Sequence, residues 1–105
     1  MTNEITTEAG MTGAEMRREF AELSEALPAL VRAAEQTAQK LEAAQERLDG
    51  IDADQWHGKP SGALAGALSA VQTAEIEAAR AKLALGANHR RRLELVQRLR
   101  ALVTA

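Results

Sequence analysis

Residues 16–51 read MRREFAELSEALPALVRAAEQTAQKLEAAQERLDGI, and their apolar pattern indicates how the chain folds. Apolar or small residues recur in it at alternating intervals of four and three positions, namely Met16, Phe20, Leu23, Leu27, Leu30, Ala34, Thr37, Leu41, Ala44, Leu48 and Ile51. This heptad seam is typical of a helix that packs along its length against another helix. We therefore predict one long helix over about 13–49.

The composition favours an all-α protein. Aromatic residues make up 2% of the 105 residues, as Phe20 and Trp56, and there is no tyrosine. Such a chain is poor in the residues that favour strands, whereas Ala, Leu, Glu, Arg and Gln are strong helix formers. The length suits one domain. We expect an antiparallel two-helix hairpin over residues 13–103.

Local signals set the ends of the first helix. Thr12 and Glu15 have the spacing of a capping box, with Thr12 as N-cap, so residues 1–12 are predicted to form a flexible N-terminal tail. Pro28 lies inside the heptad seam and removes one backbone hydrogen bond. A kink at Pro28 and a helix that ends near Glu25 are both open, and the unbroken heptad favours the kink.

Turn-forming residues concentrate between 50 and 60, where Gly50 is expected to end the first helix. The second helix should then cover about 61–103. Its apolar pattern is poorer, because Glu75 and Lys82 fall on the predicted seam. Gly86 interrupts it further, so we expect the helix to be weakened or bent there.

A lone hairpin buries little apolar surface against its chain entropy, so we expect a partner. The predicted core seam consists of Phe20, Leu23, Leu27, Leu30, Leu41, Leu48, Leu64, Leu68 and Val71. The predicted partner contacts are Trp56, Val96, Leu99, Leu102 and Val103. A second copy, giving a homodimer, or another helical protein would complete a four-helix bundle.

Charge supports the antiparallel arrangement. Residues 1–55 carry 12 acidic and 5 basic side chains, whereas residues 56–105 carry 3 acidic and 8 basic ones. Folding about the 50–60 turn brings the acidic start of the first helix alongside the basic end of the second. Exposed ion pairs contribute at most about 1 kcal/mol each, so they set orientation more than stability.

No motif predicts catalysis, and we expect a non-enzymatic protein without cofactor, bound metal or small-molecule substrate. Asp52, Asp54 and His57 are the nearest approach to a metal cluster. An EF-hand counted from Asp52 requires glycine at its sixth position and an acid at its twelfth, where this chain has His57 and Ala63. These residues are better explained as a solvated turn that caps the second helix.

Arg90, Arg91, Arg92 and Arg98 form a possible basic patch for nucleic acid. Consecutive helical residues point about 100° apart, however, and Glu94 is spaced to pair with Arg90 and Arg98. Pairing with the acidic first helix, or with an acidic partner, is therefore the favoured interpretation. Nucleic-acid binding is kept as an alternative.

The start of the sequence lacks the basic and apolar regions of a signal peptide, and no stretch approaches the roughly 20 apolar residues of a membrane span. There is no cysteine. We expect a cytoplasmic protein, or one exported without a cleaved signal peptide.

Trp56 and Gly58 lie between the two predicted helices, where Trp56 either plugs the end of the hairpin or contacts a partner. This Trp-x-Gly arrangement resembles the Trp-x-Gly family of small type VII (ESX) secretion substrates. The resemblance implies a leaderless helical hairpin that pairs into a dimeric four-helix bundle. The leading prediction is nevertheless a protein–protein interaction module, an adaptor or assembly subunit that acts through its apolar helix faces and the Trp56 turn.

Overall fold

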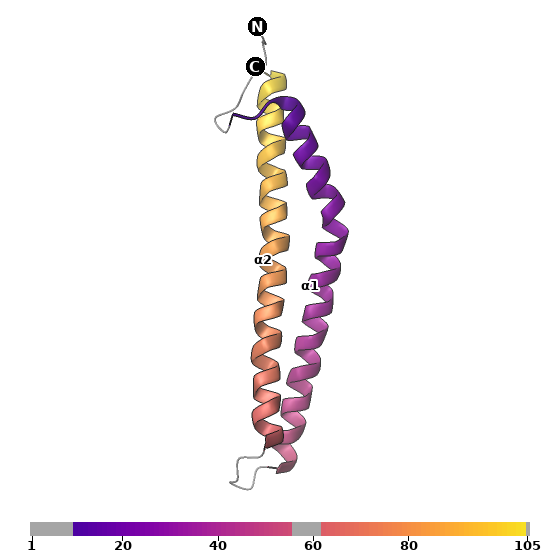
Figure 1. Ribbon diagram of the computed structural model, residues 1–105, viewed down its shortest axis with the longest axis vertical. Helices are drawn as coiled ribbons and strands as arrows, with labels where there is room; N and C mark the ends of the chain where they lie inside the picture. The colour runs from indigo at the N-terminus through magenta and orange to yellow at the C-terminus, as the bar shows by residue number, and fades with distance from the viewer. Residues whose placement is uncertain (1–9, 56–61, 105) are drawn as a thin grey trace. The chain divides into compact units, whose positions relative to one another are not determined.

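The computed structural model describes residues 10–55 and 62–104, except for the side chains of 52–55. The described chain consists of two α-helices of 43 residues each, α1 (Gly13–Gln55) and α2 (Gly62–Thr104), and contains no strand (Figure 1). The two helices contact each other extensively and run antiparallel. The predicted all-α hairpin is therefore confirmed.

α1 begins where the sequence predicts. The Thr12 hydroxyl accepts a hydrogen bond from the Glu15 backbone N–H at 3.1 Å and donates one to the Glu15 carboxylate at 3.2 Å. The Met16 N–H bonds the Thr12 carbonyl at 3.0 Å, as expected of an N-cap residue. Gly10 just upstream has a φ of 74°, a conformation that suits glycine.

The heptad seam of α1 is confirmed along its whole length. Each of its eleven predicted positions, from Met16 to Ile51, is buried or half-buried. Thr37 tolerates its place in the seam because its hydroxyl donates to the Ala33 carbonyl at 2.8 Å, within the same helix.

The predicted end of the first helix is wrong. α1 continues through Gly50 to Gln55, beyond the expected end near residue 49. Gly50 costs about 1 kcal/mol relative to alanine inside a helix, but the seam residues Leu48 and Ile51 on either side of it are half-buried. α1 also continues through Pro28, so the alternative of a helix that ends near Glu25 is excluded.

The predicted seam of α2 needs a correction. Leu68 is 47% exposed and therefore lies outside the core, whereas its neighbour Ala67 is fully buried. Leu64 is half-buried and Val71 is buried, as predicted. The observed seam keeps the alternating spacing of three and four and consists of Leu64, Ala67, Val71, Ala74, Ala78, Ala81, Leu85, Asn88, Arg92, Leu95, Leu99 and Leu102, all buried or half-buried.

This seam explains why α2 continues through Gly86 as the single helix that was expected. The helix is unbroken from Gly62 to Thr104. Seam residues Leu85 and Asn88 flank Gly86 and are themselves half-buried and buried. Packing on both sides of the glycine offsets its poor helix propensity.

The hairpin divides into two compact units. Unit 1 comprises Met1–Leu30 and Ala84–Ala105, and unit 2 comprises Val31–Leu83. In unit 1 the buried residues include the large side chains of Met16 and Leu95 together with Asn88. In unit 2 they are small, namely Ala67, Val71, Ala74 and Ala78. Unit 1 therefore has a core of large and polar side chains, and the α2 side of unit 2 is an alanine seam.

Candidate functional site

A polar layer lies inside unit 1, centred on Asn88. This side chain is 4% exposed and occupies a position of the α2 seam. Its amide nitrogen donates to the Leu23 carbonyl of α1 at 2.9 Å, and its amide oxygen accepts a hydrogen bond from Arg92 Nε at 2.7 Å. A satisfied asparagine in a helix–helix seam favours one register over its neighbours. Asn88 thus fixes how α2 is aligned with the first part of α1.

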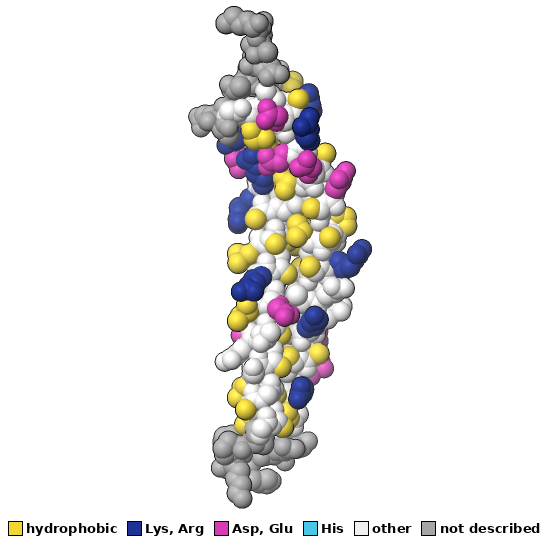
Figure 2. All heavy atoms as spheres, in the orientation of Figure 1, with side chains coloured by type: hydrophobic (Ala, Val, Ile, Leu, Met, Phe, Trp, Pro, Cys, Tyr) yellow, Lys and Arg dark blue, Asp and Glu magenta, His cyan; other side chains and the backbone are white. Residues whose placement is uncertain are grey.

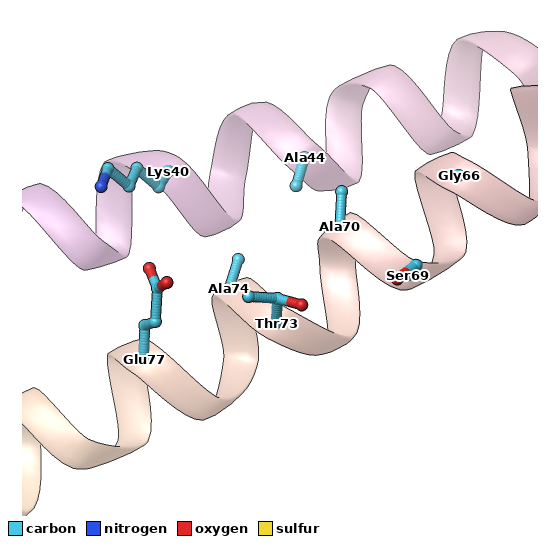
Figure 3. A pocket seen from close by; sticks show the side chains of 8 residues that line it. All are labelled: Lys40, Ala44, Gly66, Ser69, Ala70, Thr73, Ala74 and Glu77. Atoms are coloured by element: carbon cyan, nitrogen blue, oxygen red, sulfur yellow. The ribbon is translucent and has the colours of Figure 1, made fainter.

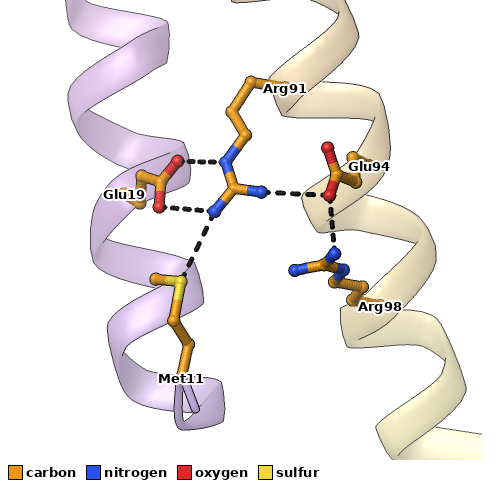
Figure 4. Close-up of polar contacts among 5 residues, drawn as sticks. All are labelled: Met11, Glu19, Arg91, Glu94 and Arg98. Atoms are coloured by element: carbon orange, nitrogen blue, oxygen red, sulfur yellow. Dashed lines mark hydrogen bonds and ion pairs between the residues drawn. The ribbon is translucent and has the colours of Figure 1, made fainter. Parts of the chain in front are cut away.

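A ladder of charged side chains covers the edge of the same unit (Figure 4). Arg91 of α2 binds the Glu19 carboxylate of α1 in a two-pronged pair through Nε and Nη2, the latter at 2.9 Å. Glu94 accepts contacts from Arg91 at 3.1 Å and from Arg98 at 2.7 Å. Arg91 Nη2 also lies 3.4 Å from the sulfur of Met11. The ladder therefore ties the residues just before α1, the first turns of α1 and the end of α2 together.

The ladder changes the acidity of its members. The hydrogen bonds from Arg91 lower the pKa of Glu19, with desolvation opposing the shift and the positive charges of Arg91 and Arg98 adding to it. In return, the hydrogen bond with Glu19 raises the pKa of Arg91. Both groups are therefore charged at neutral pH, as a structural ion pair requires.

These contacts show where three arginines of the predicted basic patch are engaged. Arg91 contacts Glu19 and Glu94, Arg92 contacts Asn88, and Arg98 contacts Glu94. Arg90, the fourth, is exposed. The ion pairs of Arg91 and Arg98 agree with the interpretation that pairs these arginines with acidic side chains. Arg92 instead bonds the neutral amide of Asn88, and Glu94 pairs with Arg91 rather than with Arg90.

A small groove of about 160 Å³ lies on unit 1, lined by Phe20, His89, Arg92, Leu93 and Val96. Phe20 comes from α1 and the other four residues from α2. Leu93 is 51% exposed at its rim. Arg92 is held by Asn88. The groove is a shallow, largely apolar contact surface with one fixed cation beside it.

A larger and more open groove of about 500 Å³ lies on unit 2 (Figure 3). Small side chains form most of its lining, which consists of Lys40, Ala44, Gly66, Ser69, Ala70, Thr73, Ala74 and Glu77. Lys40 on α1 and Glu77 on α2 are the charged residues in this set. The groove results from the small residues of α2.

A second apolar face of α2 points away from the seam in unit 2. Leu68, Ile76 and Leu83 are 47%, 53% and 67% exposed. The space-filling view shows hydrophobic side chains at the surface among charged ones (Figure 2). Because α2 carries apolar residues on two faces, one toward α1 and one toward solvent, it has the pattern of a helix with packing partners on both sides. We call Leu68, Ile76 and Leu83 the outer face of α2.

The predicted partner contacts fall in different places. Leu99 and Leu102 continue the seam of α2 and are half-buried, as is Val96, whereas Val103 is 85% exposed. In unit 1, Leu102 Cδ1 lies 3.5 Å from where a Cβ on Gly13 would be. Trp56 lies outside the described residues. Leu99 and Leu102 thus take part in packing within the hairpin.

The predicted turn cluster cannot be placed, because His57 and the side chains of Asp52 and Asp54 lie outside the description. Over 10–51 and 62–104, no group of three or more His, Asp or Glu side chains is arranged to hold a metal ion. Neither helix, over the residues described, contains a segment long and apolar enough to cross a bilayer.

No protein-family model matches the chain, and neither a curated protein nor a solved structure is significantly similar to it.

Proposed function

We propose that this chain is a non-enzymatic protein–protein interaction module, a helical-hairpin adaptor or assembly subunit. It works by packing a partner helix against the outer face of α2. The observation that carries the proposal is the exposure of Leu68, Ile76 and Leu83 by about half or more on a helix whose other face is already packed. Burying each of these side chains would contribute roughly 1 kcal/mol or more.

A second hairpin packed on this face would complete a four-helix bundle.

The fold also suits the type VII secretion resemblance, in which a helical hairpin pairs with a second hairpin. In that case the interaction module would be an exported one. Nucleic-acid binding has less support, because Arg91, Arg92 and Arg98 are already bonded within the chain.

The proposal is tested by the native size of the protein in an extract of the cells that make it. Gel filtration with detection by antibody should give the wild type an apparent mass above that of a monomer. The Ile76→Glu and Leu83→Glu variants should elute as monomers, because a carboxylate on the outer face disfavours burial. Ala38→Glu places the same charge at an exposed position of α1 and should elute like the wild type.

Elution of the wild type as a monomer in the extract would contradict the proposal. So would a larger species that persists unchanged in both outer-face variants.

A further inference from the structure

The part of α2 from Glu75 to Leu83 has an internal symmetry. Ile76, Ala79 and Leu83 follow one another at intervals of three and four, so they lie on one stripe of α2. Ile76 and Leu83 are large and exposed, and the small, exposed Ala79 lies between them. A stripe with a small residue at its middle allows a second helix to approach closely at that point.

The two charges on one edge of this stripe share the symmetry. Glu75 and Lys82 are seven residues apart, which places them on the same edge of the stripe, about 10 Å apart along the helix. Both side chains are exposed. At this separation they do not satisfy each other, and within the described residues neither forms an ion pair. One end of the edge is therefore negative and the other positive.

We propose that a second copy of this chain packs its α2 antiparallel against this stripe, about a two-fold axis that passes close to Ala79. Reversing the stripe about that point places Ile76 of each copy against Leu83 of the other. The same reversal places Glu75 of each copy beside Lys82 of the other. The stripe of Ile76, Ala79 and Leu83, with Glu75 and Lys82 along one edge, is thus complementary to itself, which is the condition for a closed, isologous dimer.

This inference rests on the proposed function and names its partner. A partner of different sequence would not require the two ends of the stripe to be complementary to each other. A second copy requires that apolar residues, and opposite charges, exchange places under the two-fold axis, and both pairs do so here.

The test uses the purified full chain and exchanges the two charges. In Glu75→Lys each contact across the axis joins two lysines, and in Lys82→Glu each joins two glutamates. Both homodimers should dissociate about tenfold more readily than the wild type, since the two-fold axis doubles every pairwise change. Far-UV circular dichroism should remain unchanged, because both positions are exposed.

Two combinations should restore association. A mixture of the Glu75→Lys and Lys82→Glu chains has opposite charges at both contacts, so it should form a heterodimer close to the wild type in affinity. The double variant Glu75→Lys/Lys82→Glu reverses both charges on each chain and should again form a homodimer. A parallel pairing of α2, which places each residue beside itself, would give a different result. Like charges would already meet in the wild type, so neither single exchange would weaken the homodimer, and only the mixture would bind more tightly.

Cysteine cross-linking gives an independent measurement, since the chain has no cysteine of its own. Under mild oxidation Ala79→Cys should form a disulfide-linked dimer, because a residue on the axis lies next to its own copy. Ala38→Cys, at an exposed position of α1, is the control and should remain largely uncrosslinked.

Light scattering on the purified wild type tests the pairing of two copies separately from the proposed function. A monomer at all concentrations up to the millimolar range overturns the pairing of two copies. The proposed function would then still be decided by the size of the protein in the cell extract. The two-fold pairing itself is overturned if the dissociation constant of the dimer is unchanged by both charge exchanges, or if the dimer does not cross-link through position 79.

Discussion

Asn88→Ala should destabilise the hairpin by about 2 kcal/mol. The substitution removes the amide that donates to the Leu23 carbonyl and accepts a hydrogen bond from Arg92. At a site that is 4% exposed, losing the bond to Leu23 costs about 1 kcal/mol. Arg92 is half-buried and partly regains water, so its lost bond and the small cavity together cost about as much again.

The assay is thermal unfolding followed by far-UV circular dichroism, at a protein concentration where the mass of wild type and variant is the same. For a chain of this size, 2 kcal/mol corresponds to a fall in Tm of roughly 10 °C. Arg90→Ala is the matched control, because Arg90 is exposed on the same turns of α2. It should change the Tm by no more than about 3 °C.

Asn88→Leu separates the polar bonds from the packing. Leucine suits a seam position, so it should recover most of the stability that alanine loses, while it removes the preference for one register. A Tm for Asn88→Ala within 2 °C of the wild type would contradict this prediction. It would mean that a buried amide with two hydrogen bonds contributes nothing to stability.

Three further predictions concern the ends and the middle of the helices. Because the pKa of Glu19 is lowered in the folded chain, its stabilising contribution is complete above its ordinary value of 4.5 and is lost as the pH falls through the lowered value. Wild type should therefore lose more stability than Glu19→Gln between pH 6 and pH 3, measured as the fall in Tm. An equal fall in Tm for both proteins would contradict the ion pair with Arg91. Thr12→Ala should cost about 1 kcal/mol, seen as faster amide exchange at the start of α1, with exchange in unit 2 as the internal reference. Gly86→Ala should stabilise α2 by about 1 kcal/mol in thermal unfolding, since a Cβ there meets only Arg90 Nη1 at 4.0 Å, and a lower Tm would show that Gly86 is needed for packing.

Much of the hairpin follows from sequence alone, because helix formation depends on neighbours in the chain. The Thr12 cap and the seam from Met16 to Ile51 are local patterns, and both are confirmed. Gly50 is the exception, since a glycine after a long helix usually ends it. Here the seam continues to Ile51, and burial of that side chain outweighs the cost of the glycine.

The candidate site was harder to predict because α2 has two apolar faces. Hydrophobicity alone favours Leu68 as a core residue, whereas the structure places Ala67 in the core and leaves Leu68 exposed. The spacing of three and four from Leu64 was present in the sequence, but alanines carry a weak signal when large leucines lie one residue away. Asn88 was missed for a related reason, since a polar residue in a seam is recognised only when its partner on the other helix is known.

The sequence by itself therefore determined the two helices, the start of α1 and the face that α1 buries, because these depend on residues within a few turns of one another. Only the tertiary structure decided which face of α2 meets α1. That choice depends on the combined volume of two helices. In unit 2 the seam of α1 supplies leucines, such as Leu41 and Leu48, so the face of α2 with Ala74 and Ala78 packs inward and the outer face with the larger side chains is left exposed.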